Sequence, residues 1–170
     1  MKRIVVALAL VLGAGTLTGA APDPWKRYAY PSDGFSFESP VEPQRSTSQH
    51  ENKRGPYEIH QYSMDFGDNQ AASIGVADLG PIDNPQTVLE ASRDGAVRSL
   101  PDAVVKSSSL GTYAGRRAID FEAENPTFHV RGRYIIANSR LMGVTGITPK
   151  ATPMSPTITR IFKSVRFIGK

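Results

Sequence analysis

Apolar and polar residues alternate along most of the chain beyond residue 24, which is the pattern of half-buried β-strands. Turn-forming residues separate these runs, for example Pro31-Ser32-Asp33-Gly34 and Gly67-Asp68-Asn69. The alternation predicts strands over residues 25–30, 34–39, 57–66, 70–79, 103–110, 113–123, 127–137 and 141–147. A polar run, 44–53, ends at Arg54-Gly55-Pro56, and we expect it to form a hairpin with 57–66.

Two segments follow the helical period instead. The first begins at Asn84-Pro85, which supplies an N-cap side chain and a proline suited to the first helical position. Its small and apolar residues share one face, namely Val88, Leu89, Ser92, Ala96, Ser99 and Leu100. Gly95 borders that face, and we expect the face, with its small residues, to pack closely on a sheet. Ser155-Pro156 repeats the start, and apolar residues of the second helix follow at Ile158, Ile161, Phe162 and Val165.

The strands predicted on either side of Asn125-Pro126 each have one apolar face. In the first strand this face carries Ile119 and Phe121, and in the second it carries Phe128, Val130, Tyr134 and Ile136. Pairing the two faces places the charged residues of both strands together on the other side, namely Asp120, Glu122, His129, Arg131 and Arg133. Runs of strands with two helices predict an α+β fold, a largely antiparallel sheet with two covering helices.

The amino-terminal segment has a different pattern. Lys2 and Arg3 precede an unbroken apolar run at 4–12, and small residues follow up to Ala20 and Ala21. This order is typical of a secretory signal peptide. We expect residues 1–21 to be cleaved and residues 22–170 to form a single periplasmic or secreted domain. No second apolar stretch exists, so no membrane span is expected after signal cleavage.

Composition narrows the possible functions. The chain has no cysteine, which excludes a lipoprotein anchor, disulfides and thiolate chemistry. Without Lys2 and Arg3, 18 basic residues face 16 acidic residues, so the mature protein is close to neutral and no nucleic-acid partner is expected.

No catalytic motif is present. The sequence contains no Gly-x-Ser-x-Gly elbow, no Ser-x-x-Lys placed on a helix and no phosphate-binding loop. His50 and His60 could approach each other across the hairpin, with Glu51 and Glu58 nearby, to form a metal site. We favour solvated strand residues at these positions and expect no metal, no cofactor and no enzymatic activity. A hydrolase with an unrecognised site is the remaining catalytic alternative.

Several segments, taken in order, resemble the bacterial PsbP-related secreted domains. They are Asp33-Gly34-Phe35-Ser36-Phe37 with Pro40, Tyr62-Ser63-Met64-Asp65-Phe66-Gly67-Asp68, the helix at 89–100, Leu110-Gly111-Thr112-Tyr113-Ala114-Gly115-Arg116, and Ile161-Phe162-Lys163-Ser164-Val165-Arg166-Phe167. These domains share an α/β/α sandwich with PsbP, the extrinsic subunit of the oxygen-evolving complex. The resemblance implies a binding or assembly module, and no functional residue is carried over from it.

Two features are candidate partner surfaces. Arg116, Arg117, Arg131 and Arg133 form a basic strand pair that could meet an acidic partner or an anionic envelope polymer, or could be a solvated face balanced by Asp120 and Glu122. Trp25 could anchor a partner or cover one end of the core.

Our leading hypothesis is therefore a non-catalytic module that docks onto an envelope protein through the sheet face or the early strands. The alternative is a small-ligand carrier with an apolar cavity between sheet and helix, lined by residues such as Tyr134 and Phe121. The sequence leaves the oligomeric state open.

Overall fold

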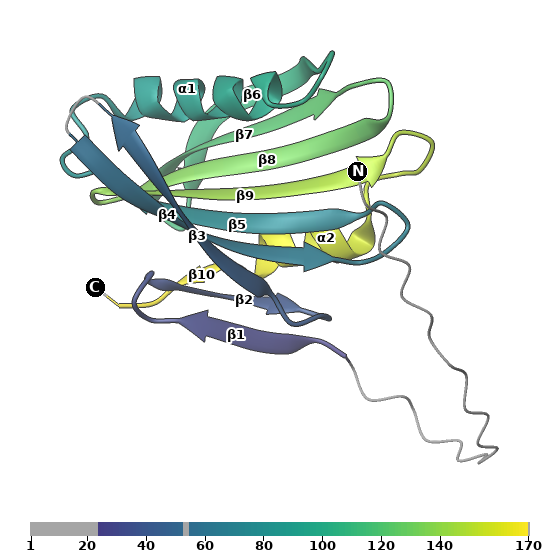
Figure 1. Cartoon of the computed structure of the whole chain (residues 1–170), viewed down its shortest axis with the longest axis horizontal. Coiled ribbons are helices and arrows are strands. Elements are labelled where there is room, and N and C mark those ends of the chain that lie inside the picture. Colours follow the sequence, from purple (N-terminus) through teal and green to yellow (C-terminus); the bar gives the residue numbers. More distant parts are fainter. Residues whose placement is uncertain (1–23, 53–54, 170) are drawn as a thin grey trace.

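The computed structural model describes residues 24–52 and 55–169, and these form two β-sheets and two α-helices (Figure 1). The larger sheet is antiparallel, with the strand order β3-β4-β5-β9-β8-β7-β6. Its strands are β3 (Gln44–Asn52), β4 (Gly55–Asp65), β5 (Ala71–Asp78), β6 (Val104–Tyr113), β7 (Arg116–Glu124), β8 (Phe128–Ala137) and β9 (Arg140–Pro149). The fold is thus α+β and dominated by strands, as the alternation predicts. Residues 1–21, for which a cleaved signal is expected, lie outside the described residues.

A second, smaller sheet joins the first and last segments of the described chain. It contains β1 (Lys26–Tyr30), β2 (Phe35–Ser39) and β10 (Arg166–Phe167), and both outer strands pair antiparallel with β2. The early strands therefore do not extend the larger sheet. They lie below it in Figure 1, on the same side as the second helix.

The two helices cover opposite faces of the larger sheet (Figure 1). Helix α1 (Pro85–Arg98) contacts β6, β7 and β8, and Asn84 caps it by accepting a hydrogen bond from the Thr87 N–H at 3.1 Å. Helix α2 (Pro156–Ser164) lies on the other face beside β2, but the Ser155 side chain makes no capping hydrogen bond. No helix of residues 24–52 and 55–169 is long and apolar enough to cross a membrane.

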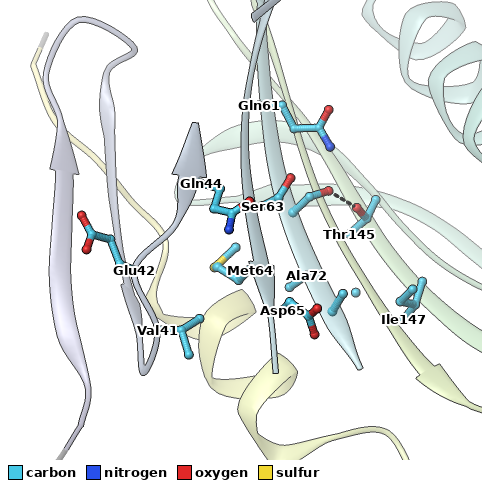
Figure 2. A pocket seen from close by; sticks show the side chains of 13 residues that line it. Val41, Glu42, Gln44, Gln61, Ser63, Met64, Asp65, Ala72, Thr145 and Ile147 are labelled. Carbon is cyan, nitrogen blue, oxygen red and sulfur yellow. Dashed lines mark hydrogen bonds between the residues drawn. The ribbon is translucent and has the colours of Figure 1, made fainter. Parts of the chain in front are cut away.

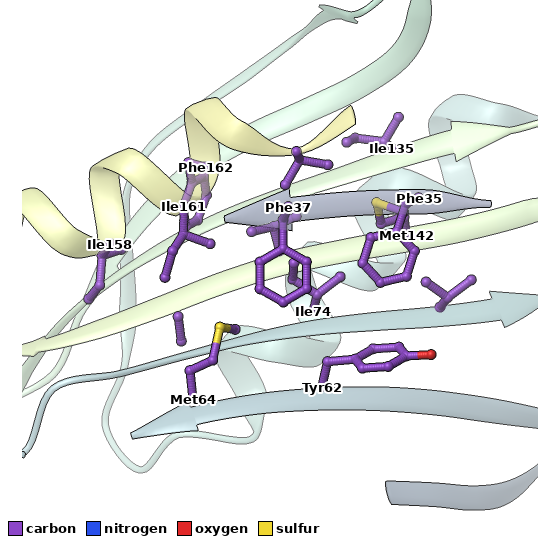
Figure 3. Close-up of a cluster of buried hydrophobic side chains, with 14 of the residues drawn as sticks. Phe35, Phe37, Tyr62, Met64, Ile74, Ile135, Met142, Ile158, Ile161 and Phe162 are labelled. Carbon is purple, nitrogen blue, oxygen red and sulfur yellow. The ribbon is translucent and has the colours of Figure 1, made fainter. Parts of the chain in front are cut away.

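The main core fills the space between α2, β2 and the larger sheet (Figure 3). Phe35 and Phe37 extend from β2 toward the sheet, and the apolar face predicted for α2 is buried against them. Close approach depends on Gly146 of β9, because a methyl group there would overlap the Ile158 side chain. Helix α2 contacts β2, and the Ser164 hydroxyl accepts a hydrogen bond from the Glu38 N–H at 2.9 Å, so the small sheet and α2 form one layer on this face.

On the α1 face, two aromatic rings lie flat over glycines of neighbouring strands. Phe121 and Tyr134 are stacked, with centroids 5.9 Å apart and planes 7° apart. Each ring covers the glycine opposite it in register, Gly132 for Phe121 and Gly143 for Tyr134, and a side chain at either glycine would overlap the ring. The apolar faces predicted for these strands are thereby confirmed.

The apolar face predicted for α1 packs on the larger sheet, with Leu89 and Val97 buried against β7 and β8. Gly95, which borders this face, is exposed, and a methyl group built on it meets no atom within 4 Å. One strand boundary is wrong. Tyr113 ends β6 instead of beginning β7, because Ala114 and Gly115 form the turn with φ angles of 49° and 75°. This turn moves the start of β7 to Arg116.

Candidate functional site

Three of the four arginines singled out from the sequence lie on one face. The register places Asp120 opposite Arg133 and Glu122 opposite Arg131, as predicted, and Arg116 follows the same alternation on β7. This is the face that carries α2, so the arginines flank a helix instead of an empty sheet. Arg117 points to the α1 face because side chains alternate along a strand, and it does not join the other three.

Each of these three arginines lies over an aromatic ring. The guanidinium carbon of Arg116 lies 4.0 Å from the centroid of the Phe167 ring. The corresponding distances are 5.2 Å from Arg131 to Phe162 and 4.3 Å from Arg133 to Tyr113. The Tyr113 hydroxyl donates to the Phe162 and Val165 carbonyls at 3.3 and 2.9 Å, which ties β6 to the end of α2. Cation–π contacts of this kind restrain the arginine side chains before any partner binds.

The charges of this face are unevenly paired. Arg133 donates its Nε–H to Asp120 at 2.7 Å, and its side chain is only 16% exposed. Arg116 and Arg131 have no carboxylate partner within the described residues, and the same holds for Lys163 in the last turn of α2 and for Arg166, the first residue of β10. We call these five cations, Arg116, Arg131, Arg133, Lys163 and Arg166, the basic surface. With Asp120 and Glu122 as its acids, it has a net positive charge.

Trp25 lies apart from the basic surface, just before β1. It is partly buried and packs against the main core, and the Arg160 guanidinium carbon lies 4.1 Å from its ring centroid. Of the two interpretations offered for Trp25, the structure supports the one in which it covers an end of the core.

The structure does not bring the hairpin histidines together. In the β3–β4 register His60 lies opposite Thr47, and His50 lies opposite Tyr57. His50 bonds to the Ser48 hydroxyl at 2.9 Å, and His60 turns away to Asp33. Across the part of the chain that the structure describes, no group of three or more His, Cys, Asp or Glu side chains is arranged to hold a metal ion.

Asp33 forms a polar junction between the two sheets that the sequence does not indicate. Its carboxylate is 6% exposed and accepts hydrogen bonds from the Tyr62 hydroxyl and from His60 Nδ1, the latter at 2.8 Å. Burial, together with the hydrogen bond to Asp33, raises the pKa of Tyr62 above its usual value. The sequence indicates only a turn at Asp33, and no sequence pattern links a turn aspartate to a strand histidine 27 residues later.

The larger sheet also carries a hollow of about 470 Å³, whose lining comes from the start of β3 and from β4, β5 and β9 (Figure 2). Its polar side chains are amides, hydroxyls and carboxylates, and its lining contains no cation. They are Glu42, Gln44, Gln61, Ser63, Asp65, Ser73 and Thr145. Ser73 and Thr145 hydrogen-bond to each other at 2.9 Å, whereas the side chains of Gln44, Gln61 and Ser63 have no such partner within the described residues.

A second hollow, of about 220 Å³, continues from the first and shares Gln61, Ser73 and Thr145 with it. Tyr134 lines this second hollow, but all of its lining residues belong to strands, so it is not the cavity between sheet and helix that the carrier hypothesis expects. Phe121 instead lies in the core beneath α1, packed against Val97.

The two sheets, with one helix on each face of the larger sheet, define a PsbP-like fold. The solution structure of cyanobacterial PsbP (CyanoP) from Synechocystis sp. PCC 6803 matches this chain with a TM-score of 0.57. The match covers 90% of this chain and 98% of that chain at 12% sequence identity, a level at which the likeness concerns the fold alone. No protein-family model and no curated protein matches the chain.

Proposed function

We propose that this protein is an extracytoplasmic, non-catalytic binding module whose basic surface docks onto an acidic region of an envelope protein. The observation that supports this is the group of four cations without a carboxylate partner, Arg116, Arg131, Lys163 and Arg166, around the end of α2. The pattern of residues 1–21 supports the compartment, and the absence of catalytic motifs supports a binding role.

The energetics favour binding through this surface. Two of the unpaired cations, Arg116 and Arg131, already lie over aromatic rings, so less side-chain freedom is lost when a carboxylate arrives. Complementary charges accelerate association and select the partner, and both effects weaken as salt screens them. Docking should therefore be tighter at low ionic strength.

The test is carbodiimide crosslinking in the native host, because this reagent joins a lysine amine directly to a carboxylate. Lys163 is exposed and should couple to the partner, which mass spectrometry of the crosslinked peptides then identifies. The double variant Arg131→Glu/Lys163→Glu should lower the affinity for that partner at least tenfold. Arg133 is left unchanged because its reversal would break the ion pair with Asp120.

Lys26→Glu is the matched control. Lys26 is an exposed cation on β1, and its reversal changes the net charge by two units, as much as each single reversal in the double variant, without touching the basic surface. Thermal unfolding of all variants shows whether the fold is intact. If the control and the double variant lose equal affinity for the partner, or if neither loses any, the basic surface is ruled out as the docking site.

A second candidate function is small-ligand transport, which the hollow in Figure 2 favours. Its volume of about 470 Å³ lies within the usual range for ligand sites, and its amides and hydroxyls suit an uncharged polar ligand. Native mass spectrometry of protein purified from the host should then show a retained mass that Ser73→Leu removes. Unliganded protein from the same host would count against this function.

A further inference from the structure

One edge of the larger sheet is both open and apolar. Strand β6 pairs with β7 on one side and has no strand neighbour on the other within the described chain. Among the described residues, all three exposed large apolar side chains lie on this strand: Val104 at 54%, Val105 at 42% and Leu110 at 48%. An open edge strand presents unpaired N–H and C=O groups that can pair with another extended chain.

The usual protection of such an edge is weak on β6. Natural edges are blunted by lysines and bulges, and β6 has both near its start, at the irregularity between Val105 and Ser107. Lys106, however, forms an ion pair with Glu124 of β7, with its Nζ 3.1 Å from Oε1. From Ser107 to Tyr113 the register with β7 is regular, and no residue of this stretch is charged. This half of the strand can accept a further strand.

A groove lies beside the same half of β6, between the strand and α1. It encloses about 390 Å³, and its apolar lining comes from Leu89, Leu110 and Ala118. Gln86, Thr112 and Arg117 supply its polar lining, which contains no carboxylate. One hydrogen bond, from Arg93 of α1 to the Ser108 hydroxyl at 2.9 Å, holds the helix to the strand. The groove thus lies between β6 and α1, and its lining is partly apolar and contains one cation, Arg117.

Arg117 determines what this groove would accept. It is exposed and has no carboxylate partner within the described residues. A carboxylate brought by a ligand would therefore pair with Arg117 without displacing an internal bond. Residues of β6 itself include no acid, so a second copy pairing through the same strand would leave Arg117 unpaired. The charge favours another protein over self-association.

We propose that β6 receives an extended segment of a partner protein as an added strand. Backbone hydrogen bonds along 107–113 hold the segment, one of its apolar side chains enters the groove beside Leu89 and Leu110, and its carboxylate pairs with Arg117. Strand addition of this kind derives affinity from the backbone and selectivity from pockets that accept alternate side chains. The proposal goes beyond the basic surface and uses none of its residues.

The test uses a phage-displayed library of random ten-residue peptides with free carboxyl termini, selected on the immobilised mature protein. Selected peptides should combine β-branched or aromatic residues with an acidic residue or the terminal carboxylate. Their affinity should fall at least tenfold in Arg117→Glu and in Leu110→Ser, whose side chains are exposed. Arg45→Glu, on the opposite edge strand β3, is the control and should bind as the wild type does.

Hydrogen exchange locates the peptide on the protein. Amides within 107–113 should gain protection when a selected peptide binds, and amides of β3 should not. Three results would overturn the proposal: no enriched peptide, peptides that bind Arg117→Glu and Leu110→Ser as well as the wild type, or protection elsewhere. Sedimentation showing a dimer that Leu110→Lys dissociates would assign this edge to a second copy. Crosslinking through Lys163 tests the basic surface separately, so either proposal can fail alone.

Discussion

At the scale of single residues, two glycines with opposite surroundings allow a direct test of packing. At Gly146 of β9, a methyl group would overlap Ile158 of α2, so Gly146→Ala forces the helix away from the sheet. Overpacking of a core costs about 1–3 kcal/mol. We expect a loss of stability of that size in urea-induced unfolding monitored by circular dichroism.

Gly95→Ala is the same substitution in open space. Gly95 lies within α1, three residues before its last residue, Arg98, and an added methyl group meets no atom within 4 Å. Alanine favours a helix over glycine by about 1 kcal/mol, so this variant should be more stable than the wild type. If both substitutions destabilise the protein equally, contact between α2 and the sheet is not what requires glycine at position 146.

These residues also show where sequence reasoning stops. The periodicity places Gly95 correctly at the border of the apolar face of α1, but it does not give the distance from the helix to the sheet. Gly146 shows no local signal, because its neighbour Ile158 belongs to a helix that packs on it only in the folded chain. Asp33 is similar: its turn is visible in the sequence, but its bonds to His60 and Tyr62 depend on how two sheets meet.

At the scale of elements, the two helices begin with the same signature but are capped differently. Asn84 accepts a hydrogen bond from the Thr87 N–H, whereas the Ser155 side chain makes no capping bond. Asn84→Ala should therefore cost about 1 kcal/mol of stability. Ser155→Ala should cost clearly less, and urea unfolding of the two variants side by side makes the comparison. Equal costs would show that the signature, and not the hydrogen bond, stabilises the helix start.

Element types and faces could be predicted well, because alternation and the helical period are local properties. Boundaries could not be predicted equally well where a turn interrupts the alternation. The turn at Ala114-Gly115 separates Tyr113 from Arg116, and each strand keeps its own alternation. Arg116 and Arg117 are neighbours in sequence but lie on opposite faces, so the four arginines expected to act together are divided between two surfaces.

At the scale of the whole molecule, the division into two sheets is the feature that no local pattern indicates. Strands β1 and β2 are predicted from their alternation, but β10, the second partner of β2, comes from the other end of the described chain. The layer that they form with α2 covers the main core. Asp33 adds a polar contact between this layer and β4, through His60 and Tyr62. The arrangement of the layers is thus determined by contacts distant in sequence.

The contact between Asp33 and Tyr62 should make the stability of the protein depend on pH in the alkaline range. Burial and the Asp33 hydrogen bond raise the pKa of Tyr62 in the folded state, while in the unfolded chain it has its ordinary value of about 10. The folded state therefore holds the proton more tightly. The stabilisation that results from this difference in pKa is complete below pH 10. It is lost as the pH rises from there toward the folded-state pKa, by up to about 1.4 kcal/mol of unfolding free energy per pH unit.

Tyr62→Phe removes the titrating hydroxyl but keeps the buried ring. At pH 7 the variant should lose about 1 kcal/mol with the hydrogen bond, and Asp33 should retain His60 as its donor. Above pH 10 its stability should fall less steeply than that of the wild type. Some slope should remain, because burial also raises the pKa of Tyr30 and of Tyr134. Urea unfolding at pH 7, 9, 10 and 11 measures the difference.

Tyr57→Phe is the control for this series, since Tyr57 lies on the same strand but contacts His50 at the hairpin end instead of Asp33. Above pH 10, the stability of this variant should decrease with pH as steeply as that of the wild type. A slope unchanged in Tyr62→Phe would mean that the Tyr62 hydroxyl does not couple the two sheets. If the decrease of stability with pH is reduced only in Tyr62→Phe, the alkaline loss of stability is assigned to the junction at Asp33, where the Tyr62 hydroxyl joins the turn between β1 and β2 to β4.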